Sequence, residues 1–140
     1  MFLASTGFVA KISLQDGAEI WRHAVEPRFQ RIAVDTNGEL VAVGTRSRPE
    51  ADGEQMIIAK YSGTTGAELW QYVPPSGFAG PGEGTSLVIN SAGDVFAGGS
   101  LSENPAINYP DFVVLKLSGA NGAEVWRYTL PSLAGHGGRV

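Results

Sequence analysis

The chain has 140 residues, a formal net charge of −4 and no cysteine. Its basic residues are scattered, which excludes the clustered basic face of a nucleic-acid-binding protein. The lack of thiols excludes disulfides, thiolate metal sites and thiol catalysis. No segment approaches the roughly 18 consecutive apolar residues of a membrane span. Residues 1–10 have no basic start, so we expect no signal peptide there.

In chain order, the sequence predicts short strands joined by glycine turns, and no helix. Residues 1–6 and 8–12 are apolar runs on either side of Gly7, and a turn through Gly17 leads to a strand with Trp21. The next elements are strands at 32–34, 40–43 and 57–61, a strand with Trp70, strands at 87–89, 95–97 and 113–117, and a strand with Trp126. Gly accepts positive φ, so Asp-Gly and Asn-Gly turns favour antiparallel hairpins.

A twelve-residue phrase occurs three times. It reads KISLQDGAEIWR at 11–22, KYSGTTGAELWQ at 60–71 and KLSGANGAEVWR at 116–127, with its tryptophans 49 and 56 residues apart. A second repeat pairs RIAVDTNGELVAVGT at 31–45 with SLVINSAGDVFAGGS at 86–100. Repeats of roughly 40–56 residues are in the range of propeller blades and related arrays.

The repeats predict an all-β fold made of β-propeller blades, each with four antiparallel strands. Both faces of such a sheet are apolar because blades stack on one another. Trp21, Trp70 and Trp126 would then lie between adjacent blades, because each is the same large apolar residue at the same repeat position.

About three blades are expected in this single domain, with blade parts at 1–30, 31–85 and 86–134 and a terminal strand at 135–140. Closed propellers have typically four to eight blades. We therefore expect either a piece of a larger propeller or closure by oligomerisation. A homodimer with about six blades is preferred, in which the terminal strand pairs with residues 1–5 of another copy.

The phrase resembles the repeat of pyrroloquinoline-quinone-type propellers, Ala-x-Asp-x-x-x-Gly-x-x-x-Trp. The glycines and tryptophans of the three copies match it, while Lys and Ser replace its Ala and Asp. IAVDTNGELVAVG, leading to IIAKYS, resembles the bacterial β-propeller repeats called SBBP repeats. This second resemblance implies a bacterial and extracytoplasmic protein without assigned chemistry. The quinone cofactor is not carried over, because the chain lacks the length and the acidic cluster of the eight-bladed enzymes.

Several polar residues have simple structural interpretations. Lys11, Lys60 and Lys116 recur together with Glu19, Glu68 and Glu124, which predicts a cross-strand ion pair in each hairpin. Asp35–Glu39 begins like a calcium loop but lacks its closing ligands, so a turn is expected. His23 follows Trp21 on the outermost strand and is expected to be an ordinary rim residue.

The candidate binding residues are Arg28, Glu83 and His136, each four residues before a predicted first strand. This position carries a different ionisable group in each repeat and would lie on a loop at the mouth of the central channel. Simple solvent-exposed loop residues are the alternative interpretation. The loops 46–55 and 101–111, the second with Tyr109, are candidate partner-binding tips.

Two functions are compatible with these patterns. The first is a non-catalytic scaffold or binding module with a protein or carbohydrate partner and no cofactor. The alternative is a propeller hydrolase or lactonase with calcium or another divalent metal in the channel. The central strands are apolar, so only residues near their ends, such as Glu83, His136 and Asp35, would be available as ligands. The sequence therefore favours the module.

Overall fold

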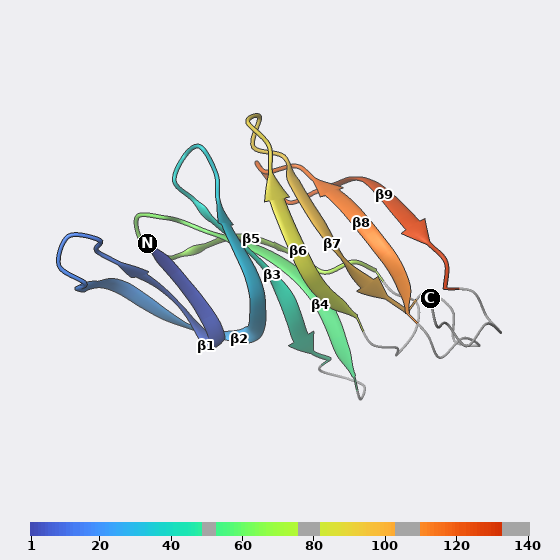
Figure 1. The fold of residues 1–140 in the computed structure, drawn as a ribbon, viewed down its shortest axis with the longest axis horizontal. Helices are drawn as coiled ribbons and strands as arrows, with labels where there is room; N and C mark the ends of the chain where they lie inside the picture. Colours follow the sequence, from blue (N-terminus) through green and yellow to red (C-terminus); the bar gives the residue numbers. More distant parts are fainter. Residues whose placement is uncertain (49–52, 76–81, 103–109, 133–140) are drawn as a thin grey trace.

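The structure is a computed structural model that describes residues 1–48, 53–75, 82–102 and 110–132. Its strands are β1 (Phe2–Ile12), β2 (Glu19–Val34), β3 (Leu40–Ser47), β4 (Glu54–Tyr61), β5 (Glu68–Tyr72), β6 (Glu83–Ile89), β7 (Val95–Leu101), β8 (Asp111–Leu117) and β9 (Glu124–Leu130). None of these described ranges contains a helix, and thus none contains a helix able to cross a membrane. The predicted all-β fold is confirmed (Figure 1).

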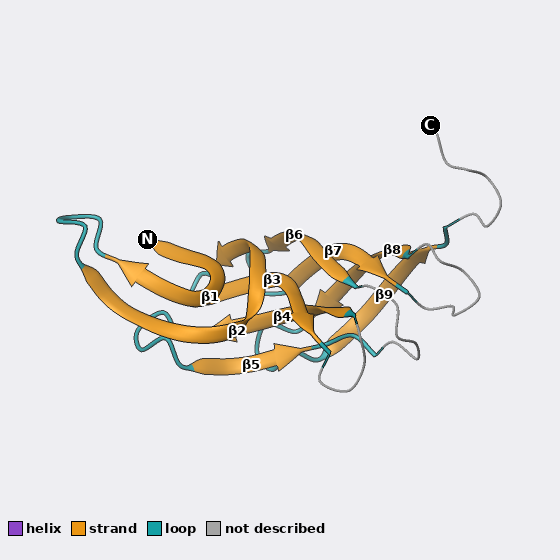
Figure 2. Ribbon diagram, turned by 90° about the horizontal axis from the view of Figure 1, so that it is seen from below, coloured by secondary structure: helices purple, strands orange, loops and turns teal. Residues whose placement is uncertain are grey.

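The strands form two antiparallel sheets. The first has the order β1-β2-β3-β4-β5 and the second the order β6-β7-β8-β9, so every hydrogen-bonded neighbour is also a neighbour in sequence. Figure 2 shows the strands in layers with loops at their ends. This up-and-down order is the order expected for propeller blades.

The strand β1 is a hairpin within one continuous extended segment. Backbone hydrogen bonds of 2.8 Å run in both directions between Met1 and Ile12, so the two halves of β1 lie antiparallel. Gly7, with φ of 92°, makes the tight bend between them. Only glycine adopts this φ readily, which explains how a single residue joins the two strands expected at 1–6 and 8–12.

The strand β2 passes from one hairpin to the next without a break. Its first part pairs with β1, as in Val9 opposite His23, and its last part pairs with β3, as in Ile32 opposite Ala42. Arg28 lies opposite both Thr6 and Thr45. The sequence led us to expect separate strands on either side of residue 30 and about eleven strands in all, whereas β2 runs across that boundary and the described residues form nine strands. The boundary itself stays a prediction.

Two apolar clusters hold the structure together. One joins the two sheets, with Met56, Ile58 and Trp70 of the first sheet packed against Val113 and Leu115 of the second. The other lies where the β1–β2 hairpin folds over β3 and β4, with Val9 and Phe29 among its buried members. Both faces of β4 are buried as a result, since Met56 to Tyr61 are all buried. Stacked sheets with two apolar faces are the packing expected of adjacent blades.

Candidate functional site

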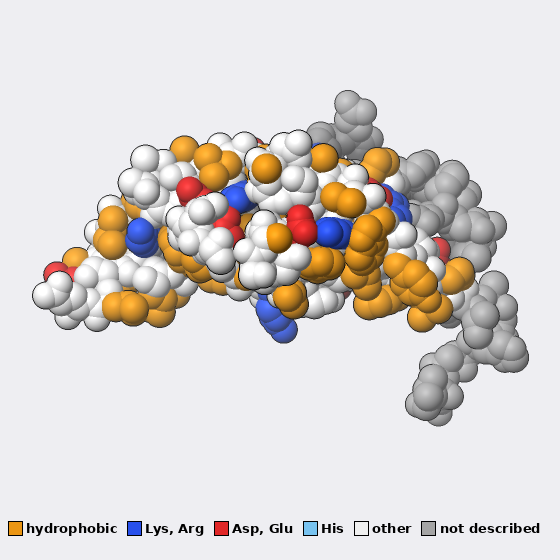
Figure 3. Space-filling view, turned by 90° about the horizontal axis from the view of Figure 1, so that it is seen from above, with side chains coloured by type: hydrophobic (Ala, Val, Ile, Leu, Met, Phe, Trp, Pro, Cys, Tyr) orange, Lys and Arg blue, Asp and Glu red, His pale blue; other side chains and the backbone are white. Residues whose placement is uncertain are grey.

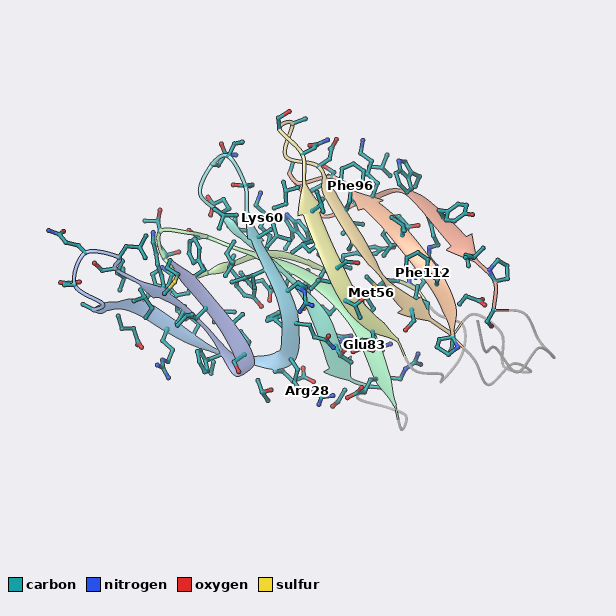
Figure 4. The ribbon with its side chains drawn as sticks, in the orientation of Figure 1. Arg28, Met56, Lys60, Glu83, Phe96 and Phe112 are labelled. Carbon is teal, nitrogen blue, oxygen red and sulfur yellow. The ribbon has the colours of Figure 1, made fainter. Side chains whose placement is uncertain are left out.

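Arg28 and Glu83 lie at one end of the two sheets. Arg28 belongs to β2, and Glu83 is the first residue of β6, where it pairs with Ser100. Figure 4 shows both labelled side chains at the lower end of the strands. We expected them on loops, and this was wrong, because β2 and β6 begin earlier than the apolar runs that marked them. His136 lies outside the described residues.

An open hollow of about 290 Å³ lies between these two residues. Its lining consists of Thr6, Arg28, Phe29, Gln30, Thr45, Glu54 and Glu83. These residues come from β1, β2, β3, β4 and β6, so the hollow exists only because the two sheets stack. We call this set of residues the end hollow.

The polar groups of the end hollow are paired with one another. The guanidinium of Arg28 donates to the carboxylate of Glu54, and the amide of Gln30 donates to the carboxylate of Glu83. The Arg28 and Glu54 side chains remain about half exposed. Exposed ion pairs contribute roughly 0–1 kcal/mol to stability. The charges of the end hollow therefore remain accessible to a partner and matter little for folding.

Phe29 forms the apolar base of the end hollow. It is buried, and its ring meets that of Tyr61 edge-on, with centroids 6.0 Å apart and an angle of 78°. Burial, together with the charge of Glu68, raises the pKa of the Tyr61 hydroxyl to about 12. Because Phe29 is locked in the core, its neighbours Arg28 and Gln30 are directed outwards on the alternating strand.

Two of the tryptophans contact the next glycine turn. The indole nitrogen of Trp70 donates to the carbonyl oxygen of Gly119 over 3.1 Å, and that of Trp21 donates to the carbonyl oxygen of Gly63 over 3.4 Å. Trp70 is 9% exposed, whereas Trp126 is 43% exposed. The same residue type at the same repeat position is thus covered where a later glycine turn packs on it, and no described turn packs on Trp126.

Two of the three repeated lysines, Lys60 and Lys116, pair with turn carboxylates rather than with the repeated glutamates. Lys60 meets Asp35 over 2.7 Å and Lys116 meets Asp94 over 3.0 Å. The predicted Lys–Glu pairs were wrong, because a register shift before Tyr61 places Trp70, and not Glu68, opposite Lys60. The sequence did contain a signal for these pairs that we missed. The turn between β2 and β3 begins with Asp35, and the turn between β6 and β7 ends with Asp94.

Of the two turn carboxylates that pair with a lysine, Asp35 is more buried than Asp94. Its own burial raises the pKa of Asp35, but the hydrogen bond and charge of Lys60 and the backbone donors of Glu39 and Asn37 outweigh this, so the pKa lies below its usual range. The same carboxylate accepts hydrogen bonds from the Asn37 and Glu39 amides at 2.9 Å. The expected turn at Asp35 is confirmed, and its carboxylate is engaged by these donors and by Lys60.

The other features singled out in the sequence are His23, a possible metal site and the loop 101–111. The Nε2 atom of His23 lies 2.8 Å from the carbonyl oxygen of Thr65 on the exposed rim. Within residues 1–48, 53–75, 82–102 and 110–132, no three His, Asp or Glu side chains gather in a group that would hold a metal ion. Tyr109 and most of the loop 101–111 lie outside the described residues.

Comparisons with known proteins address the fold. No protein-family model and no curated protein matches the sequence. Among solved structures, the chain is similar to the quinohemoprotein alcohol dehydrogenase ADHIIG from Pseudomonas putida HK5, with a TM-score of 0.64 and 14% identity over 91% of this chain and 24% of that chain. It is also similar to BamB from Moraxella catarrhalis, with a TM-score of 0.41 and 20% identity over 98% of this chain and 48% of that chain.

These likenesses concern architecture. The chain spans about a quarter of the dehydrogenase chain and about half of BamB. Together with the stacked antiparallel sheets, the likeness to the dehydrogenase shows that the chain consists of β-propeller blades. The resemblance to pyrroloquinoline-quinone-type propeller repeats thus holds at the level of the fold, and the resemblance to SBBP repeats stays a prediction.

Proposed function

We propose that the chain is a non-catalytic propeller module that binds a protein partner at the end hollow. The observation that carries this proposal is the end hollow itself, where exposed opposite charges from both sheets surround a buried phenylalanine. Protein interfaces commonly combine such a polar, solvent-accessible rim with a small apolar centre. The rim is rigid because each of its residues lies on or beside a strand.

The lining of the end hollow favours a protein over a small apolar ligand. It combines one guanidinium, two carboxylates, one amide and two hydroxyls with one aromatic ring. Sites for small ligands are mostly apolar and enclose most of the ligand surface. An open, polar hollow fits side chains that project from a larger molecule. A carbohydrate is the competing partner, since hydroxyls and amides also bind sugars.

The metal-dependent hydrolase has less support. A channel metal needs several converging oxygen or imidazole ligands. In the described ranges, Glu83 is held by Gln30 and Glu54 by Arg28. Our proposal therefore includes no resident metal. It retains the homodimeric ring of about six blades as the preferred assembly.

Site-specific photo-crosslinking tests where a partner binds. A crosslinking residue at the exposed Thr6, in the lining of the end hollow, should capture a protein, and the same residue at the exposed turn position Thr64 should not. The captured protein is identified by mass spectrometry, purified and titrated against the chain. Equal capture from both positions would contradict a specific site.

Two substitutions then test the charges. Arg28→Ala and Glu83→Gln should each weaken binding of the purified partner by about tenfold, or about 1.4 kcal/mol. Leu69→Ala, an exposed change on β5 outside the end hollow, should leave binding unchanged. Elemental analysis and esterase or lactonase assays complete the test. A stoichiometric metal that is lost in Glu83→Gln, together with turnover, would favour the hydrolase instead.

A further inference from the structure

The outer face of the second sheet is apolar, and no residue that the structure describes packs over it. Cross-strand pairing places Phe112 opposite Leu130 and Lys116 opposite Trp126, so these four side chains share one face. The exposed large apolar residues on this face are Val88, Phe112, Trp126, Tyr128 and Leu130. Figure 4 labels Phe96 and Phe112 on this sheet, and hydrophobic side chains gather toward the right-hand end of the molecule in Figure 3.

The interface between the two sheets shows what covers the equivalent face of the first sheet. There, the carbonyl oxygen of Gly119 accepts hydrogen bonds from Lys60 Nζ over 2.9 Å and from Trp70 Nε1 over 3.1 Å. The Trp70 ring lies against Gly122, where a Cβ would come within 2.5 Å of it. A lysine and a tryptophan thus bind one turn of the following sheet.

The same arrangement occurs one step earlier in the chain. The carbonyl oxygen of Gly63 accepts from Lys11 Nζ over 2.7 Å and from Trp21 Nε1 over 3.4 Å. A Cβ on Gly66 would come within 2.7 Å of the Trp21 ring. The contact is therefore a repeated interface of this protein, and Lys116 and Trp126 are its third donor pair.

A third receiving turn is also present, and it is empty. In the turn Ser13–Ala18, the Gly17 amide donates to the Ser13 carbonyl over 3.0 Å, and the corresponding bonds of Gly66 and Gly122 measure 2.8 Å. The φ of Gly17 is 73°, against 75° and 74° for those two glycines. Leu14 holds the place in this turn that Gly63 and Gly119 hold in theirs. Nothing lies within 4 Å of a Cβ built on Gly17.

We propose that Lys116 and Trp126 of one copy bind the Ser13–Ala18 turn of a second copy, head to tail. The donor pair lies on the second sheet and the receiving turn on the first, so each copy offers both halves of the repeated interface. The Leu14 carbonyl accepts from both donors, and the Trp126 ring covers Gly17. This inference rests on the homo-oligomer proposed above and specifies the residues that join its subunits.

Leu14 does not block this docking. At Gly63 and Gly119, the atoms closest to a Cβ are the carbonyl oxygens of Gly38 and Gly93, which belong to the turns of the same sheets. On the side of the incoming tryptophan, the nearest atom that a Cβ on Gly63 would meet belongs to Phe2 at 3.5 Å, which is an ordinary van der Waals contact. Leu14 is 80% exposed. Its side chain, with the exposed Met1, Leu3 and Ile20 of the first sheet, adds apolar area for the second copy to cover.

Sedimentation equilibrium tests the proposal. The unmodified chain should associate, and Trp126→Ala should raise its dissociation constant at least tenfold. Because Trp126 is exposed in the single chain, the variant should keep the circular dichroism of the unmodified chain. Leu69→Ala, an equally simple loss of an exposed apolar residue on β5, should associate normally. A monomeric unmodified chain, or normal association of Trp126→Ala, would overturn the proposal.

A complementation experiment tests the head-to-tail geometry. Gly17→Asn fills the receiving turn with a residue that tolerates positive φ, and it should also weaken self-association. A mixture of Trp126→Ala and Gly17→Asn retains one intact interface per pair, so it should form a mixed dimer more readily than either variant forms its own. A mixture no more associated than its components would overturn this geometry.

Arg28→Ala separates this proposal from the partner-binding function. The end hollow lies away from the outer face of the second sheet, so Arg28→Ala should associate like the unmodified chain while binding its partner about tenfold more weakly. Association that depends on Arg28 and not on Trp126 would overturn the interface proposed here. Loss of partner binding with normal association would concern the end hollow alone.

Discussion

Lys60 connects the two sheets through two acceptors at once. Its ammonium group pairs with Asp35 of its own sheet and donates to the Gly119 carbonyl of the other. The side chains of Lys60 and Asp35 are only 9% and 2% exposed. A buried charge is tolerated only where such partners compensate for the lost hydration. Lys60 therefore links the two sheets in one relative position.

Replacing Lys60 tests this role. Lys60→Met keeps the aliphatic stem but leaves the Asp35 carboxylate buried without its cation, so unfolding in urea should become easier by about 3–5 kcal/mol. Arg22→Met, which removes a cation from the exposed pair with Glu19, should cost about 0–1 kcal/mol. Equal costs for the two variants would show that the Lys60 pair is not buried as described.

The lowered pKa of Asp35 predicts that the free energy of unfolding decreases in acid. Its pKa is lower in the folded chain than the ordinary value of 3.8, so the folded state favours the carboxylate. The stabilisation is fully present above pH 3.8 and is lost as pH falls through the lower folded pKa. Urea unfolding as a function of pH should show this decline.

Asp35→Asn provides the control for that decline. The variant cannot titrate at this position, so its stability should fall less steeply in acid than that of the unmodified chain. A residual slope is expected, because the pKa of Asp94 is also lowered, chiefly by its hydrogen bonds with Lys116 and Asn90. Identical slopes for the two proteins would contradict the role given to Asp35.

At the scale of single elements, the glycine turns have two separate structural roles. Gly38 has φ of 79° with no atom within 4 Å of its missing Cβ, so it is required for backbone conformation alone. Gly122 has φ of 74°, and the Trp70 ring occupies the space of its Cβ. The second type of turn is therefore also a packing surface for the preceding sheet.

Alanine substitutions separate these two roles. Gly38→Ala should cost roughly 1–2 kcal/mol from positive φ. Gly122→Ala carries the same backbone cost and also displaces Trp70, which should add about 1–3 kcal/mol. Tryptophan fluorescence should shift only in Gly122→Ala, because that change alone moves an indole ring. Equal destabilisation of the two variants would show that Trp70 does not need the glycine.

At the scale of the whole molecule, stacking decides which apolar residues become core. Met56 and Phe112 occupy equivalent positions, four residues before Lys60 and Lys116. Met56 is fully buried and Phe112 is 48% exposed (Figure 4), because the second sheet covers the first and no described residue covers the second. The two residues hold the same repeat position, and the presence or absence of a stacked sheet accounts for their different exposure.

This asymmetry predicts different costs for equivalent truncations. Met56→Ala should destabilise the chain by about 2–5 kcal/mol, as expected for a buried residue, and it should lower the stability of both sheets in one transition. Phe112→Ala should cost less than about 1 kcal/mol. Both are best measured by urea unfolding with Trp126→Ala also present, so that self-association does not contribute. Similar costs would mean that the outer face is covered in the single chain.

Much of this structure was predictable from local patterns. The alternation of apolar residues around Gly17, Gly66 and Gly122 predicted the hairpins, because strand period and positive φ are local properties. The continuity of β2 was not predictable, since Pro27 and the charged residues around it look like a loop in the sequence. Pairing with β1 on one side and β3 on the other keeps this segment extended.

The candidate site was predictable only in part. The variable repeat position identified Arg28 and Glu83, and Glu54 lay in the predicted partner-binding loop 46–55, but Gln30 and Thr45 carried no recognisable signal. The predicted Lys–Glu pairs failed for a related reason. A one-residue register shift in a strand pair moves a side chain to the other face, and the sequence does not mark where that shift occurs.

The sequence by itself determined the strands, their glycine turns and the blade repeat, because these depend on interactions between residues close in the chain. Only the tertiary structure decided that Lys60 pairs with Asp35, that Trp70 is buried while Trp126 is exposed, and that Arg28 and Glu83 share one hollow. Each of these depends on which sheet stacks on which and in what register. Stacking is a property of the assembled surfaces, so three nearly identical phrases acquire three different environments.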